Sequence, residues 1–299
     1  MSFVLLSVVC SVLVSVLLKL ARRYAVDVGQ AIAWNYVVAS ALTAWLLPWP
    51  LTTVRVPEAT WLALVGLGVL LPTIFLALGA AVRHAGIVRS DAAQRLSLLL
   101  SLLAAFVWFG ERLDAPKALG IALGLLALLG MVWKQHAPEI AGGVARPHAD
   151  GHAASAPRAR WLYPLLVFVG FAVIDILFKQ VALAGVPLGA SLQIMFALAL
   201  VVAVALQLWR RARGQTQFTL RSALGGLVLG LFNFGNILFY LRAHRALPRH
   251  PALVFTSMNI GVVALGAMVG LLIFREQLSK INAVGVALAI LAIALVARA

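Results

Sequence analysis

The sequence predicts an all-α, polytopic membrane protein of ten transmembrane helices, arranged as two inverted five-helix repeats. Of its 299 residues, 63% are hydrophobic and 11% are charged, against about 45–50% and about 25% in soluble domains. Apolar stretches of about 20 residues, enough to cross a bilayer core of about 30 Å, follow one another along the chain. The alternating ten-residue strands of a membrane β-barrel are not visible. The third observation is a similarity between the two halves of the chain.

Each expected helix is one apolar stretch between loops that carry charged residues, Pro or Gly. The first stretch has no basic start and no clear cleavage site, so it is predicted to be a span rather than a signal peptide. The segment 135–160 is rich in Ala, Gly, Pro, His and Arg and is predicted to be a flexible linker between repeats at 1–134 and 161–299. The helices are expected at 3–22, 29–48, 60–82, 87–109, 115–133, 161–182, 187–209, 220–242, 251–273 and 280–298.

The two halves resemble each other in sequence. A shift of 165 residues places FGERLDAPKALGIALGLLA (109–127) on FREQLSKINAVGVALAILA (274–292), with nine identities in nineteen positions. A shift of 160 residues places Lys19 on Lys179. Because each half has an odd number of helices, the second half must enter the membrane with the opposite polarity, which predicts an inverted repeat.

Both halves also carry E-x-L just after their fourth helix, as Glu111-Arg112-Leu113 and Glu276-Gln277-Leu278. With this motif and ten helices, nearly the whole chain resembles the EamA-type branch of the drug/metabolite transporter superfamily. The resemblance implies that the first four helices of each half surround a central cavity. It implies a secondary transporter that exports a small polar metabolite, such as an amino acid, by alternating access, with proton coupling as a further expectation. The alternative is a membrane scaffold or lipid-handling protein whose buried polar residues are structural.

Two full charges lie in the apolar sixth stretch, FAVIDILFKQ. Asp175 is near the middle of the predicted span, where a charge costs about 2.5–3.5 kcal/mol on insertion scales. Lys179 lies one helical turn further on, on the same face. The two could form a structural ion pair. Alternatively, they face the central cavity, where Lys179 attracts an anionic group of the cargo and Asp175 takes up protons.

Other polar residues within the apolar stretches are candidates to line the same cavity. Two carboxamides and a phenol in the eighth stretch recur at i, i+3 and i+7, and they could bind an uncharged or zwitterionic solute. Two further amides coincide under the 165-residue shift, and hydrogen bonds between helices are the alternative for all of these groups. The candidates besides Asp175 and Lys179 are Lys19, Asn233, Asn236, Tyr240, Gln94, Asn259, Asn35 and Gln193. Gly226 and Gly230 are expected to allow close helix packing instead.

Other function classes find no support in the sequence. There is no Walker loop, no pair of catalytic carboxylates and no Ser/His/Asp set, so no enzyme activity, cofactor or metal site is expected. Cys10 is the only cysteine, which excludes an intramolecular disulfide. The net charge of +15 is explained by loop residues that set topology and bind lipid headgroups, not by nucleic acid. The expected partners are a small-molecule substrate, the lipid bilayer and protons, with the chain as a monomer or homodimer.

The orientation of the chain in the membrane follows less directly from the sequence. Outside the apolar stretches, the loops after the odd-numbered helices hold fourteen Lys and Arg, and the opposite side holds seven. By the positive-inside rule this places the linker in the cytoplasm and both termini outside. The resemblance instead implies that both termini are inside, so the orientation stays open. The expected location is the plasma membrane, specifically the bacterial inner membrane, as a multi-pass protein.

Overall fold

The computed structural model describes residues 1–49, 56–85, 87–132, 157–272 and 280–298, and these ranges are helical throughout apart from short loops. The predicted linker, 135–160, lies outside the described residues as far as residue 156. Every predicted helix is present, in most cases within a few residues of its expected bounds. The helices are α1 (Ser2–Arg23), α2 (Val28–Leu46), α3 (Glu58–Ala85), α4 (Ile87–Val107), α5 (Ala115–Val132), α6 (Pro157–Leu183), α7 (Leu188–Ala212), α8 (Leu220–Ala246), α9 (Pro251–Leu272) and α10 (Lys280–Arg298).

Within the described ranges, six helices are long and apolar enough to cross a membrane, namely α1, α3, α6, α7, α8 and α9. Shorter apolar stretches lie within α4, α5 and α10. Large apolar side chains such as Leu62, Leu103 and Val201 are more than half exposed on the outside of the bundle. An outer surface of this kind suits contact with lipid rather than water. The fold is therefore that of a multi-pass membrane protein, and membrane crossing by all ten helices remains a prediction.

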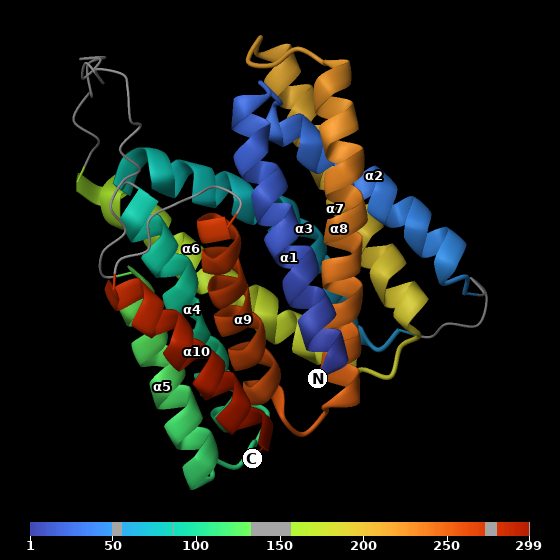
Figure 1. The fold of residues 1–299 in the computed structure, drawn as a ribbon. Helices are drawn as coiled ribbons and strands as arrows, with labels where there is room; N and C mark the ends of the chain where they lie inside the picture. The colour runs from blue at the N-terminus through green and yellow to red at the C-terminus, as the bar shows by residue number, and fades with distance from the viewer. Residues whose placement is uncertain (50–55, 86, 133–156, 273–279, 299) are drawn as a thin grey trace.

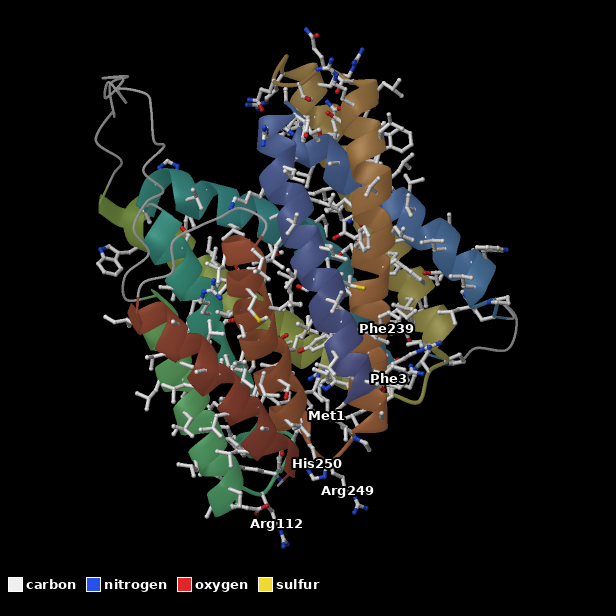
Figure 2. The ribbon with its side chains drawn as sticks, viewed as in Figure 1. Met1, Phe3, Arg112, Phe239, Arg249 and His250 are labelled. Carbon is white, nitrogen blue, oxygen red and sulfur yellow. The ribbon has the colours of Figure 1, made fainter. Side chains whose placement is uncertain are left out.

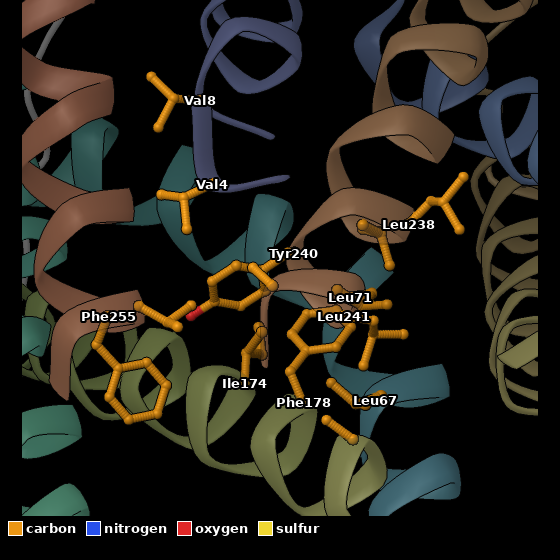
Figure 3. Packing of buried hydrophobic residues seen from close by; sticks show 14 of the residues in the cluster. Val4, Val8, Leu67, Leu71, Ile174, Phe178, Leu238, Tyr240, Leu241 and Phe255 are labelled. Carbon is orange, nitrogen blue, oxygen red and sulfur yellow. The ribbon is translucent and has the colours of Figure 1, made fainter. Parts of the chain in front are cut away.

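The helices form one bundle in which neighbours come from both halves of the sequence (Figure 1). Helix α1 packs on α8 and α9, and α6 packs on α3 and α4. Helix α2 packs on α7 and α8, while α5 lies against α10. The core between them holds large apolar side chains, several of which are drawn in Figure 3.

Local chemistry sets several helix ends. Gly110, Gly185 and Gly214 follow α4, α6 and α7 and have φ values of 67°, 70° and 68°, which glycine adopts without steric cost. Helix α2 starts where the side chain of Asp27 accepts the Gln30 N–H, at 3.1 Å, as an N-cap residue does. These short, well-defined connections hold neighbouring helices in register.

The bundle has two ends that matter for the site. The start of α1 and the end of α10 lie at the same end (Figure 1), which we call the termini end. Figure 2 shows Met1, Arg112, Arg249 and His250 there, so the α4–α5 loop (108–114) and the α8–α9 loop (247–250) lie at this end. We call the opposite end, which contains the α1–α2 loop (24–27) and the α7–α8 loop (213–219), the far end.

Helices α2 and α8 meet almost backbone to backbone. A Cβ atom on Gly226 would lie 2.7 Å from the Ala31 carbonyl oxygen, and one on Gly230 would lie 2.8 Å from that of Asn35. No real side chain tolerates such distances, so only glycine permits this approach. The packing role predicted for both glycines is confirmed.

Candidate functional site around Asp175

Asp175 lies inside the bundle and is held by three other helices. Its Oδ1 accepts a hydrogen bond from the Tyr240 hydroxyl of α8 at 2.8 Å. Its Oδ2 accepts one from the Ser101 hydroxyl of α4 at 2.9 Å. The side chain of Asn259 in α9 is a third polar neighbour. Asp175 therefore contacts polar groups of three neighbouring helices, and that it faces a central cavity stays a prediction. Figure 3 shows the Tyr240 ring directed toward α6 beside Ile174 and Phe178.

Taken as a whole residue, Asp175 is not completely enclosed. It keeps an intermediate exposed fraction although its polar neighbours come from α4, α8 and α9, and Asn236 and Asn259 are also of intermediate exposure. A carboxyl group with two hydroxyl donors can also bind a proton or an amine. The hydrogen bonds offset part of the free-energy cost of burying the charged form.

Lys179 and Asp175 form hydrogen bonds with different groups. Its side chain is fully buried, and its Nζ donates a hydrogen bond of 2.7 Å to the Pro248 carbonyl oxygen in the α8–α9 loop. One helical turn thus separates a carboxylate in the centre of the bundle from an ammonium group directed to the termini end. The simple ion pair considered from the sequence is not what these contacts describe.

Glu111, the acid of the first E-x-L motif, lies beside this loop. Its Oε2 accepts a hydrogen bond of 2.6 Å from the backbone N–H of Ala252, in the first turn of α9. Its Oε1 lies 3.4 Å from Lys117 Nζ and 3.8 Å from His250 Nδ1. The side chains of Glu111 and Lys117 are 1% and 5% exposed. A residue of the first half therefore caps a helix of the second half, and the negative charge suits a helix N-terminus.

Three other candidates of the second half lie on α8, which also carries Tyr240, and on α9. Asn236 accepts hydrogen bonds from the Ser7 hydroxyl of α1, at 2.8 Å to its Oδ1 and 2.9 Å to its backbone oxygen. Asn233 is buried on the same helix. Asn259 also donates from Nδ2 to the Phe255 carbonyl oxygen of its own helix, at 3.0 Å. Asn236 and Asn259 thus have structural partners, and Asn259 also lies next to the Asp175 carboxylate.

The remaining four candidates are placed less directly. The Oδ1 atom of Asn35 and the Oε1 atom of Gln193 are buried without a hydrogen-bond partner among the described residues. Gln94 is half-buried on α4, and Lys19 is exposed on α1. The structure therefore brings together Asp175, Tyr240 and Asn259, with Asn236 on the same helix as Tyr240. Among the described residues, the side chains of Asn35 and Gln193 form no hydrogen bond with this group through Oδ1 and Oε1.

Two residues near the site were absent from the predicted set. Ser101 belongs to a polar stripe with Gln94 and Ser97 at helical spacing, and that stripe was the available signal. His244 lies one turn after Tyr240 and is fully buried. It was missed because the eighth helix was expected to end at residue 242, whereas α8 continues to Ala246.

A polar network at the far end joins the two halves. Arg210 of α7 forms two contacts with the Asp27 carboxylate, at 3.1 and 3.2 Å, and Thr216 donates to the same group at 2.8 Å. Burial alone would raise the pKa of Asp27, but the hydrogen bonds of Arg210, Thr216 and the Gln30 N–H, with the Arg210 charge, lower it below its ordinary value. Asp27 is therefore an ionised anchor between α2 and the α7–α8 loop.

Among the described residues, no three His, Cys, Asp or Glu side chains lie close enough together to hold a metal ion. What the site offers is a carboxyl group, hydroxyl groups and amides between helices. These groups bind polar solutes and protons.

Comparisons with known proteins agree with this arrangement. Residues 1–133 match the model of the EamA-like transporter family. An uncharacterized protein of Haemophilus influenzae is 40% identical over 293 residues, which cover 96% of this chain and 94% of that protein. A protein of known crystal structure has a similar fold. The match covers 99% of this chain and 98% of that chain, with a TM-score of 0.69 and 19% sequence identity. The last likeness concerns the fold alone.

Proposed function

Because the chain belongs to the EamA-like transporter family, we propose that it is a proton-coupled secondary transporter that exports a small polar metabolite, such as an amino acid. The observation that carries the proposal is Asp175. It is an acid in the middle of an apolar helix, it accepts hydrogen bonds from hydroxyl groups of α4 and α8, and as a residue it is of intermediate exposure. Ionisable residues within membrane helices usually mark substrate or proton pathways.

Alternating access of two inverted five-helix repeats is the mechanism that fits this placement. The predicted repeat matches α1 with α6, α3 with α8 and α4 with α9. In support, the contact of α1 with α8 then corresponds to that of α6 with α3, and the contact of α1 with α9 corresponds to that of α6 with α4. Asp175, Ser101, Tyr240 and Asn259 then lie at the junction of the two repeats. Transporters built from such repeats bind their cargo at this junction.

The residues suggest how a zwitterion is held. Asp175 binds the amine or a proton, and Tyr240, Asn236 and Asn259 supply hydrogen bonds. Lys179 binds the carboxylate of the cargo only after its hydrogen bond to the Pro248 carbonyl oxygen breaks. We therefore assign the described conformation to a state in which the termini end is closed. Asn233, Asn35, Gln193, Gln94 and Lys19 are proposed to contact the cargo in other states of the cycle. The protein acts in the bacterial inner membrane, as a monomer or homodimer.

Flux measurements with the purified protein in proteoliposomes test the proposal. The probe is a radiolabelled mixture of the twenty protein amino acids, with a pH gradient across the membrane. We expect the wild-type protein to move part of this mixture, and Asp175→Asn to abolish the movement while the protein elutes normally on gel filtration. Asp114→Asn makes the same chemical change at a half-exposed loop residue and should transport normally. Asp175→Asn protein that aggregates, beside a wild-type protein without flux, would favour a scaffold or lipid-handling role.

A further inference from the structure

His244 is a fully buried ionisable side chain that the proposed mechanism has not yet used. Neither of its ring nitrogens has a hydrogen-bond partner among the described residues. Its ring packs edge-on against Tyr240, with centroids 4.7 Å apart, and against Phe255, at 5.0 Å. An imidazole left without partners in an apolar interior loses about 1–3 kcal/mol for each unsatisfied group. Buried polar groups of this kind call for an explanation beyond packing.

The surroundings of His244 supply such an explanation. On one side, Tyr240 connects the ring to Asp175, whose Oδ1 is 2.8 Å from the tyrosine hydroxyl. On the other side lies Lys179, close enough for its charge to act on the imidazole, and Lys179 in turn lies within electrostatic range of Glu111. The titratable groups around His244 are thus Tyr240 on its own helix, Asp175 and Lys179 on α6, Glu111 in the α4–α5 loop and Arg245 beside it.

This series of groups continues to the surface of the termini end. Glu111 lies 3.8 Å from His250 Nδ1, and the His250 side chain is 43% exposed. Figure 2 shows His250 at the edge of the bundle. Ionisable groups therefore extend from the centre of the bundle to one end, and His244 occupies the stretch between the inner carboxylate and the outer cluster.

We propose that His244 is a second proton-binding site, which passes the proton between Asp175 and the termini end; this inference rests on the proposed function. When the α8–α9 loop releases Lys179, water reaches the imidazole. The protonated carboxyl group of Asp175 then gives its proton to a ring nitrogen, which leaves a carboxylate and an imidazolium ion. The Tyr240 hydroxyl donates to the carboxylate that remains. The imidazolium ion passes its proton to water at the termini end and becomes neutral again.

Flux measurements separate this role from a structural one. With the labelled amino-acid mixture, His244→Gln should reduce accumulation driven by a pH gradient about tenfold or more, a modest loss for a proton-transferring group. Exchange of labelled for unlabelled amino acids at equal pH needs no net proton movement and should stay near the wild-type rate. The matched control is His84→Gln, because His84 stacks on Tyr163 in another part of the bundle.

The outcomes are distinct. A His244→Gln protein that keeps accumulation, or that loses accumulation and exchange together, would overturn the inference and leave the transporter assignment intact. A wild-type protein without any flux would count against the proposed function instead.

A measurement without cargo then decides on His244: nuclear magnetic resonance of ¹⁵N-histidine-labelled protein in nanodiscs, with His244→Gln for assignment. We expect Asp175→Asn to change the pH dependence of the His244 nitrogen signals and not those of His84; unchanged His244 signals would refute the coupling.

Discussion

Removal of the Glu111 carboxylate is predicted to destabilise the protein strongly. In Glu111→Ala, the Ala252 N–H loses its acceptor at 2.6 Å, and Lys117 loses a carboxylate at 3.4 Å while its side chain stays 5% exposed. Loss of a helix cap alone costs about 0.5–2 kcal/mol. Breaking a buried ion pair by removal of one partner costs about 3–5 kcal/mol. Because the second figure already includes lost hydrogen bonds, we expect a total of about 3–5 kcal/mol.

Unfolding by SDS in mixed micelles, followed by tryptophan fluorescence, measures this free energy. The double variant Glu111→Ala/Lys117→Met removes both buried charges, so it should recover part of the stability that Glu111→Ala loses. Asp114→Asn, which alters a 51% exposed carboxylate 3.6 Å from the same lysine, should change stability by less than about 1 kcal/mol. The reasoning is refuted if Glu111→Ala unfolds within about 0.5 kcal/mol of the wild type, the range of an ordinary surface substitution.

Three further changes test other parts of the structure. Gly230→Val would place a Cβ 2.8 Å from a carbonyl oxygen of α2, so its apparent melting temperature in detergent should fall by several degrees. Tyr240→Phe removes the 2.8 Å donor to Asp175 and should lower the SDS unfolding free energy by about 1–3 kcal/mol; an unchanged value would argue against that bond. Because the pKa of Asp27 is lowered from 3.8, its stabilising effect is complete above that value and lost as pH falls through the folded-state pKa. Melting temperature should therefore drop below about pH 4 in the wild type and less so in Asp27→Asn.

Much of the fold could be predicted because membrane helices have a strong sequence signal. Apolar stretches of about 20 residues mark them without reference to their neighbours, and both the helical class and the family resemblance are confirmed. The ends were less certain. Helix α8 continues four residues beyond its predicted end, to Ala246, and this extension hid His244 in an expected loop.

The contacts of the site could be predicted only in part. Helical spacing shows which residues share a face, so Asp175 and Tyr240 were both candidates. Spacing does not show which helix lies opposite, however, and Glu111 binds a backbone group 141 positions later in the sequence. The E-x-L motif was visible, but its capping of another helix depends on tertiary packing. For the same reason, the four-residue spacing of Asp175 and Lys179 did not reveal that the two side chains bond to different groups.

The glycine contact between α2 and α8 limits how the protein can move. These helices belong to different sequence halves, yet at Gly226 and Gly230 the backbone of α8 lies against the backbone and Cβ atoms of α2, with no room for a side chain on α8. Under the proposed transport cycle, a rearrangement that opens one end would therefore move α2 and α8 together. Each moving unit would then combine helices from both halves of the sequence.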